Sequence, residues 1–310
     1  MDDKYNMNRK GFIKNIVLSG TGLMMPRLVR GKGTVISREP FVMKYSPNFD
    51  IFSHAAPKDP VGQIKWGYDH GFWAWEDTWL RRKPVAEQER ISKTIHQLGM
   101  DFGQFVGTAS FKEVTFAGRN KDMRAKVLQE IRESVEVAKR MNTKFVHNVL
   151  GLADYHLPWD FQMANAIELL KRVAEIYEPH GITMVMESMN QRSQPGLFLY
   201  NIPQAYAMAK AVDSPSVKVL FDIFHVQKQE GNLTDTMDYA WDEIGYFQVG
   251  NVPGRNEPGI GEIDFKFLFQ HIYDKGYRGF LGLEHGVSVK SVAGDLAAVK
   301  AYRNVDPGQM

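Results

Sequence analysis

Residues 217–225 read VKVLFDIFH, an apolar run that closes on the polar residues Asp222 and His225. A run rich in Val, Leu, Ile and Phe is typical of a strand buried on both faces, as in a parallel sheet. Similar runs recur along the chain. We expect eight strands in all, at residues 49–56, 72–77, 101–107, 144–151, 183–189, 217–225, 244–252 and 279–286.

Helical patterns separate these runs. Residues 124–141 place apolar side chains at three- and four-residue steps, and residues 161–181 and 265–277 repeat the pattern up to or near a Gly. Strands that each lead into a helix predict a single-domain (β/α)8 TIM barrel, here over residues 45–303. The alternative, an open doubly wound sheet, is disfavoured because no Gly-rich phosphate loop follows any strand.

The composition is that of a folded protein. Of 310 residues, 44% are hydrophobic and 24% are charged, near the averages for globular proteins, which argues against a disordered chain. The sequence contains no Cys. This excludes a disulfide framework, a thiolate zinc site, an iron–sulfur cluster and a cysteine nucleophile.

The first 35 residues differ from the rest in charge. They hold seven Lys or Arg and two Asp, so the remaining chain carries a net charge of −3 within the total of +2. We interpret residues 1–35 as a basic leader, either an export signal or a disordered tail. The segment NRKGFIKN resembles a twin-arginine signal with Lys10 at the second Arg position. A working signal would make the protein periplasmic, and otherwise we expect it to be cytoplasmic.

The charge and hydropathy patterns also indicate which kinds of partner the protein binds. The mildly acidic body lacks the clustered cations that bind phosphates, so we expect no nucleic-acid partner. No apolar run approaches the roughly 18 residues of a transmembrane helix, so we expect no membrane span. The partner that we expect is a small-molecule substrate.

Polar residues stand where the last four predicted strands end. Glu187, Asp222, Gln248 and Glu284 are separated by steps of about one strand–helix unit each. The active site of a TIM barrel lies at the carboxyl ends of its strands, so these side chains can converge there. Buried carboxylates repel one another unless a cation compensates them. Oxygen ligands without a thiolate favour one divalent ion, Mg²⁺ or Mn²⁺.

Four blocks in this half of the chain resemble the xylose isomerase-like TIM-barrel family, and within it the hydroxypyruvate isomerase group. They are VMESMNQRSQPGLFL (185–199), VLFDIFHVQKQEGNL (219–233), FQVGNVPGRNEPGIGEIDF (247–265) and GYRGFLGLEHG (276–286). The resemblance implies a metal held by Glu187, Asp222, Gln248 and Glu284. Gln248 is typical of hydroxypyruvate isomerases, whereas many sugar epimerases have His at this place. The first half of the chain departs from the group, which leaves the substrate open.

The family chemistry is proton transfer beside a carbonyl through a cis-enediolate. The resemblance implies that Glu187 and Glu284 are the acid–base pair as well as ligands. The hypothesis is a metal-dependent isomerase of a small hydroxy-aldehyde or hydroxy-ketone, acting on a sugar or a hydroxy-keto acid. The alternative is a keto-sugar 3-epimerase or lyase of the same barrel. An endonuclease IV-type enzyme and a non-catalytic module are disfavoured, and relatives often form dimers or tetramers, so a homo-oligomer is possible.

Four further residues are candidates for substrate binding. His225 and Arg255 match positions that contact substrate in relatives, although Arg255 could instead pair with Glu257 or Glu262 in its loop. Arg192 could face the barrel mouth or solvent. Glu76, at the end of the second predicted strand, could bind a distal hydroxyl or pair with Arg81 or Arg82. For His54 and His147 we favour a buried structural role over a position in the mouth.

Overall fold

The computed structural model describes residues 39–308. The export-signal prediction for residues 1–35 lies outside these residues. The described chain alternates strands and helices, and its elements run from Lys44 to Val305. The strands are β1 (Lys44–Pro47), β2 (Ala74–Trp75), β3 (Asp101–Phe102), β4 (Gln104–Ala109), β5 (Phe145–Val149), β6 (Thr183–Glu187), β7 (Val217–Asp222), β8 (Ile244–Val249) and β9 (Phe280–Leu283).

All strand pairs are parallel, and they form a ring. The main sheet has the order β1-β9-β8-β7-β6-β5-β4, and β2 pairs with β3, which continues into β4 after Gly103. The ring closes between β1 and β2, where the Glu76 N–H donates to the Pro47 carbonyl at 2.9 Å. The prediction of a TIM barrel is confirmed.

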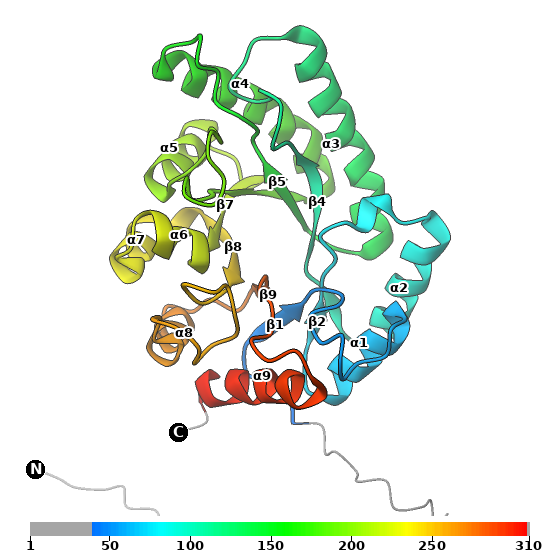
Figure 1. Ribbon diagram of the computed structural model, residues 1–310. Helices are drawn as coiled ribbons and strands as arrows, with labels where there is room; N and C mark the ends of the chain where they lie inside the picture. Colours follow the sequence, from blue (N-terminus) through cyan, green and yellow to red (C-terminus); the bar gives the residue numbers. More distant parts are fainter. Residues whose placement is uncertain (1–38, 309–310) are drawn as a thin grey trace, which may run out of the picture. The chain divides into compact units, whose positions relative to one another are not determined.

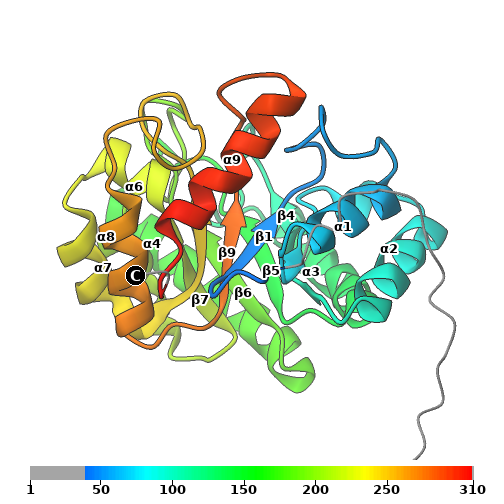
Figure 2. The same ribbon diagram turned by 90° about the horizontal axis from the view of Figure 1, so that it is seen from below.

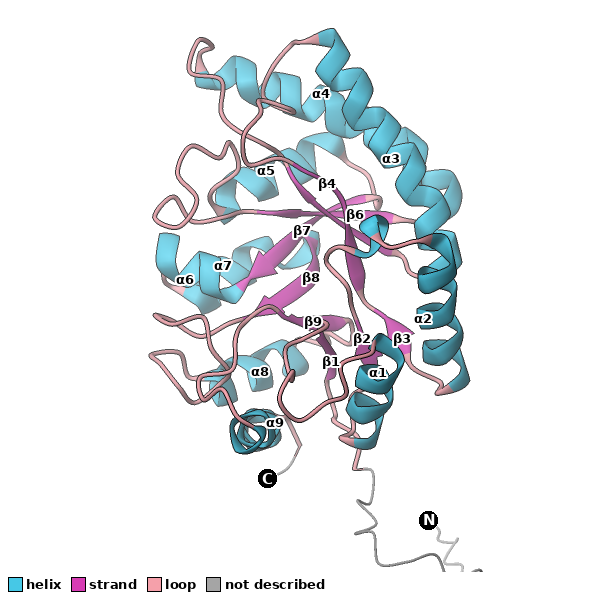
Figure 3. Ribbon diagram, turned by 45° about the vertical axis from the view of Figure 1, so that its right-hand side comes forward, coloured by secondary structure: helices cyan, strands magenta, loops and turns pink. Residues whose placement is uncertain are grey.

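The helices cover the outside of this ring (Figure 1). They are α1 (Pro60–Asp69), α2 (Val85–Gln97), α3 (Lys121–Met141), α4 (Trp159–Tyr177), α5 (Ile202–Val212), α6 (Ile223–Gln229), α7 (Leu233–Ala240), α8 (Phe265–Asp274) and α9 (Val292–Val305), with short 3-10 turns at Leu80–Arg82, Glu178–His180 and Trp241–Glu243. Figure 3 shows the strands inside and the helices outside. None of the helices in residues 39–308 has the length and hydropathy needed to span a bilayer.

The predicted first strand at residues 49–56 is wrong. The strand lies earlier, at Lys44–Pro47, and residues 49–56 form the loop that leads to α1. Asp50 has a φ of 67°, a left-handed conformation that breaks an extended chain. The apolar side chain of Phe52 is buried because its ring packs on Trp66 and Phe72. The hydrophobic pattern therefore predicts correctly that Phe52 is buried. It is wrong in predicting a strand where the chain forms a loop.

Helix α3 illustrates how local sequence sets an element's bounds. The Asn120 side chain accepts a hydrogen bond from the Met123 N–H and caps the first turn. Asn142 ends the helix in the left-handed conformation, with φ at 52°. Between these ends, Val127 and Ile131 are buried on the face that the sequence pattern predicts.

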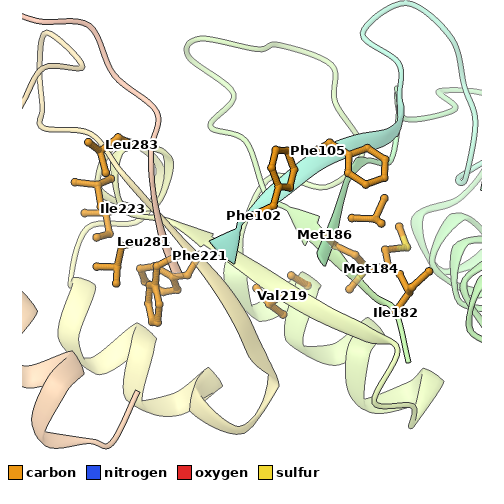
Figure 4. Close-up of a cluster of buried hydrophobic side chains, with 14 of the residues drawn as sticks. Phe102, Phe105, Ile182, Met184, Met186, Val219, Phe221, Ile223, Leu281 and Leu283 are labelled. Atoms are coloured by element: carbon orange, nitrogen blue, oxygen red, sulfur yellow. The ribbon is translucent and has the colours of Figure 1, made fainter. Parts of the chain in front are cut away.

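The strands alternate between two apolar layers. The outer layer contains every second residue of a strand. Figure 4 shows such residues from three strands: Met184 and Met186, Val219 and Phe221, and Leu281 and Leu283. The intervening residues point the other way, into the barrel. There Val185, Leu220 and Tyr246 form a separate cluster with Phe145 and Phe280. Successive side chains of a strand point to opposite faces, so each strand contributes to both layers.

A polar network in the barrel interior joins the strands near the point of closure. The fully buried Glu76 accepts hydrogen bonds from the Tyr246 hydroxyl at 2.6 Å, Gln104 Nε2 at 3.0 Å and Asn48 Nδ2 at 3.2 Å. A Cβ at Gly282 would lie 2.7 Å from Glu76 Oε2, so a side chain there would displace the Glu76 carboxylate from this network. Burial raises the pKa of Glu76 from its ordinary value of 4.5 to about 8, although the donors lower it.

This pKa predicts that Glu76 makes stability depend on pH. An acid whose pKa is raised in the folded state stabilises the fold below pH 4.5, and this contribution is lost as pH rises to about 8. Glu76→Gln stays neutral at every pH. The free energy of unfolding of the variant, relative to that of the wild type, should therefore rise from pH 5 to pH 9. We expect a change on the order of a few kcal/mol in denaturant unfolding. The exposed Glu89→Gln is the control, and an equal difference at all pH values would contradict the prediction.

Candidate active site

The candidate residues at the strand ends lie inside the barrel because of the two-residue repeat. Glu187 follows the interior residue Val185 by two positions, and Asp222 follows Leu220 in the same way. Gln248 stands two positions after the interior Tyr246. All three functional candidates are therefore directed to the interior at the carboxyl ends of β6, β7 and β8.

The strand register brings these ends to one level. Asp222 is the direct partner of Gln248 in the β7–β8 ladder. The Glu284 N–H, just after β9, donates to the Val249 carbonyl at 3.1 Å, so Glu284 is adjacent to the end of β8. Ligand atoms of Glu187, Asp222 and His225 all lie within 4.8 Å of one another. A buried cluster of metal-ligating side chains is thus present.

Several oxygen atoms of this cluster have no hydrogen-bond donor. Within residues 39–308, both carboxylate oxygens of Glu187, both amide atoms of Gln248 and Oε2 of Glu284 are buried without a hydrogen bond. His147 Nε2 lies 2.8 Å from Glu187 Oε2 as an ion-pair partner. Each unpaired buried polar group costs about 1–3 kcal/mol. Hard oxygen donors in this state fit a divalent cation such as Mg²⁺ or Mn²⁺.

Arg255 supplies positive charge to the same cluster. Its Nη2 lies 2.7 Å from Asp222 Oδ2 and 3.1 Å from Glu284 Oε1, and its Nε donates to the Glu284 carbonyl at 2.9 Å. The guanidinium also lies over the Phe224 ring, 4.8 Å from its centroid. The alternative pairing with Glu257 is not formed, because that carboxylate accepts from the Ser288 hydroxyl and N–H. An arginine brought in by the fold thus offsets part of the carboxylate repulsion.

The two glutamates have different electrostatic environments. Burial favours the neutral form of Glu187, but the facing His147 outweighs it and holds the pKa of Glu187 below its ordinary value. Burial raises the pKa of Glu284 to about 7, with the negative charges of Glu187 and Asp222 adding to the effect and Arg255 opposing it. Burial also works against the charged form of His147, yet Glu187 raises its pKa above the ordinary value.

Asn190 determines the tautomer of His225. The backbone N–H of Asn190 donates to His225 Nδ1 at 3.1 Å, and its side-chain Nδ2 lies 2.6 Å from the same atom. Asn190 Oδ1 accepts from the Ser193 N–H at 2.8 Å, which fixes the amide orientation. His225 Nδ1 is therefore an acceptor, and the ring proton is on Nε2. That atom is buried without a hydrogen bond, 3.7 Å from Glu187 Oε1.

Comparison with known proteins identifies the family of the chain. Residues 64–302 match the family model of the xylose isomerase-like TIM barrel. The chain belongs to this family. Hydroxypyruvate isomerase of Escherichia coli (strain K12) is 30% identical over 215 residues, which cover 68% of this chain and 80% of the relative. A 2-oxo-tetronate isomerase of Pectobacterium atrosepticum is 29% identical over 166 residues, 54% of this chain and 63% of the relative. The chain is an isomerase of this family, as predicted.

Solved structures of other proteins share the fold. An AP endonuclease, family 2, from Brucella melitensis superposes with a TM-score of 0.70 and 23% identity, over 81% of this chain and 96% of that one. D-psicose 3-epimerase from Clostridium cellulolyticum H10, solved with D-tagatose, gives a TM-score of 0.67 and 18% identity, over 86% and 93%. At these identities the likeness concerns the barrel alone.

Two substrate-binding candidates make no hydrogen bond or ion pair with the cluster in the described residues. Arg192 is exposed in the loop after β6, and within residues 39–308 it makes no hydrogen bond or ion pair. Glu76 is fully buried in the interior network, near enough to Glu284 for that carboxylate to raise its pKa. The suggested pairing of Glu76 with Arg81 is not formed, because Arg81 donates to the Gly107 carbonyl and pairs with Glu133.

His147 belongs to the cluster, although a buried structural role is the prediction from sequence, and no prediction names Asn190. His147 stands two residues after the interior Phe145, so the two-residue repeat would have directed it into the barrel. Its Nε2 is 2.8 Å from Glu187, which makes it part of the cluster. Asn190 lies in a loop and meets His225 across 35 residues, and no sequence pattern marks that contact.

We predict that Asn190→Asp raises the population of the His225 tautomer that carries its proton on Nδ1, against the backbone N–H of residue 190, which the substitution keeps. A carboxylate at this position accepts a hydrogen bond, so it favours a proton on Nδ1 in place of Nε2. Imidazole ¹⁵N chemical shifts of the purified protein report which nitrogen carries the proton. Asn201→Asp is the matched control, because Asn201 caps α5 and Asp serves equally well there. A wild-type spectrum with the proton on Nδ1 would contradict the assignment.

Proposed function

We propose that the protein is a divalent-metal-dependent isomerase of the hydroxypyruvate isomerase type. It interconverts a small hydroxy-ketone and hydroxy-aldehyde by proton transfer. One observation carries the proposal: Glu187 Oε1, the Gln248 amide and Glu284 Oε2 are buried at the ends of β6, β8 and β9 without a hydrogen bond within residues 39–308. The hydroxypyruvate and 2-oxo-tetronate isomerases among the relatives support the same reaction class.

The proposed metal ligands are Glu187, Asp222, Gln248 and Glu284. Their donor atoms are all oxygens, which suits Mg²⁺ or Mn²⁺. When bound, such an ion acts as a Lewis acid that polarises the substrate carbonyl and acidifies the neighbouring C–H. Arg255 contacts two of these carboxylates and keeps the local charge balanced.

Glu187 and Glu284 are the proposed acid–base pair. One carboxylate removes a proton from the carbon that bears the hydroxyl group, which gives an enediolate. The other delivers a proton to the former carbonyl carbon, and the hydroxyl proton moves to the former carbonyl oxygen, so the product is an isomer with no net gain or loss of atoms. Positioned acid–base groups contribute roughly 10²–10⁴-fold each.

His225 and Arg255 are the proposed substrate-positioning residues. The Nε2–H of His225 is an unused donor beside Glu187, so it can hold a substrate oxygen next to the carboxylate that moves the proton. Asn190 prevents the ring from presenting the wrong nitrogen. The planar guanidinium of Arg255 lies at the edge of the same cluster, where it can bind a substrate carboxylate.

Solvent proton exchange tests the reaction. We expect the protein with added Mn²⁺ to incorporate deuterium from D₂O beside the carbonyl of hydroxypyruvate or 2-oxo-tetronate, with conversion to the isomeric hydroxy-aldehyde or ketone. Nuclear magnetic resonance detects both events. Treatment with a chelator should abolish them, and Mn²⁺ should restore them. Deuterium incorporation with inversion at one carbon, and no isomer formed, would instead favour the 3-epimerase alternative.

Amide substitutions test the two-glutamate mechanism. Glu187→Gln and Glu284→Gln keep an oxygen ligand but cannot carry a proton, so we expect each to retain bound metal and lose turnover by at least roughly 10²-fold. Metal content and turnover are measured on the same preparations. Glu175→Gln, an exposed position on α4, is the control. Turnover that survives in either active-site variant would rule out the pair.

A further inference from the structure

A groove opens beside Glu284 between two loops that are far apart in sequence. It has a volume of about 400 Å³ and lies between the β1–α1 loop and the β9–α9 loop. Figure 2 shows these loops, blue and red, beside each other at the end of the barrel to which β9 points. Lining residues include Asn48, Ser53 and His54 from the first loop and Glu284, His285 and Lys290 from the second. The groove therefore extends from a proposed catalytic residue to the surface.

The buried carboxylate of Asp295 anchors the loop residue His54. Asp295 of α9 has no exposed surface, and its Oδ2 accepts hydrogen bonds from the backbone N–H groups of His54 and Ala55, both at 2.8 Å. Asp295 Oδ1 is 3.6 Å from His54 Nδ1. The imidazole thus has one nitrogen turned to Asp295. Its Nε2, on the opposite edge of the ring, has no hydrogen bond from the part of the chain that the structure describes, and the side chain is 39% exposed.

The groove offers both donors and acceptors. His54 and the ammonium group of Lys290 can donate, the Ser53 hydroxyl can donate and accept, and the Asp50 carboxylate at the rim accepts. The lining also includes the Glu284 carboxylate, so it holds two carboxylates and one ammonium group. Such a lining suits hydroxyl groups, which both donate and accept, better than it suits a second anionic group.

The volume also bears on substrate length. A three-carbon hydroxy-keto acid has no carbon beyond its two reacting carbons and its carboxylate. Ligand sites of roughly 300–1,000 Å³ accommodate molecules considerably larger than three carbons. A groove that continues from Glu284 therefore has room for further carbons of a longer substrate.

We propose that this groove binds the hydroxylated end of the substrate, remote from the reacting carbons, and that His54 Nε2 hydrogen-bonds one of its hydroxyl groups. The substrate is then a hydroxy-keto acid or ketose of four or more carbons in preference to a three-carbon acid. Asp295 is the positioning residue for His54. This inference rests on the proposed function and adds the substrate class to it.

The backbone contacts of Asp295 allow a clean test. They anchor the loop through N–H groups, so replacing the His54 side chain leaves that anchor in place. We expect His54→Leu to lower kcat/KM for 2-oxo-tetronate and for a ketohexose by roughly 2–10-fold, mainly through KM. Turnover of hydroxypyruvate should not change. His54→Gln, whose amide nitrogen can replace Nε2, should recover most of the loss.

Binding without turnover gives a second readout. Calorimetry with D-erythronate (four carbons) and D-glycerate (three carbons) should show tighter binding of the longer acid to the wild type, and His54→Leu should remove the difference. His180→Leu is the control, since His180 is exposed in the 3-10 turn that precedes β6, at the opposite end of the strands.

The outcomes separate the two proposals. If the wild type converts hydroxypyruvate but rejects the longer substrates, or if His54→Leu affects all substrates equally, the groove proposal is wrong while the proposed function stands. Equal binding of erythronate and glycerate would also overturn it. If no candidate exchanges deuterium in the presence of Mn²⁺, the proposed function fails and the groove proposal fails with it.

Discussion

The two-residue alternation of side chains along parallel strands is the constraint on which the site depends. Each strand must bury one set of apolar residues against the helices and another inside the barrel. Once Val185, Leu220 and Tyr246 are committed to the interior, Glu187 and Asp222 have no other direction available. A one-residue shift in any of these strands would send the functional side chain into the helix layer. The hydrophobic core thereby sets the position of the polar cluster.

Bringing like charges together is costly, and the fold offsets this cost with groups from several elements. Arg255 reaches Asp222 and Glu284 from the loop after β8, and His147 faces Glu187 from β5. These contacts leave oxygen atoms of Glu187 and Glu284 unpaired within residues 39–308. The cluster is therefore partly neutralised, and some of its oxygen atoms remain available to a further partner.

How much of this could be read from the sequence depends on the range of the interactions. Apolar runs predicted the strands that carry Glu187 and Asp222, and their spacing predicted that these residues converge. The first strand was misplaced because Phe52 packs its ring on Trp66 and Phe72 from a loop, and burial alone does not distinguish a loop from a strand. The contact of Arg255 with Asp222 spans 33 residues and follows from the folded loop, which no local pattern encodes.

One barrel fold can serve several substrates because its strands carry the proposed acid–base residues and its loops line the groove. The proposed acid–base residues are fixed by strands whose register is shared with their neighbours, so a change there disturbs the whole ring. The groove beside Glu284 is built from loops, and the β1–α1 loop is tied to α9 through the carboxylate of Asp295. Loop residues can change without altering strand register. Selection of the remote end of the substrate can therefore vary independently of the proton transfer.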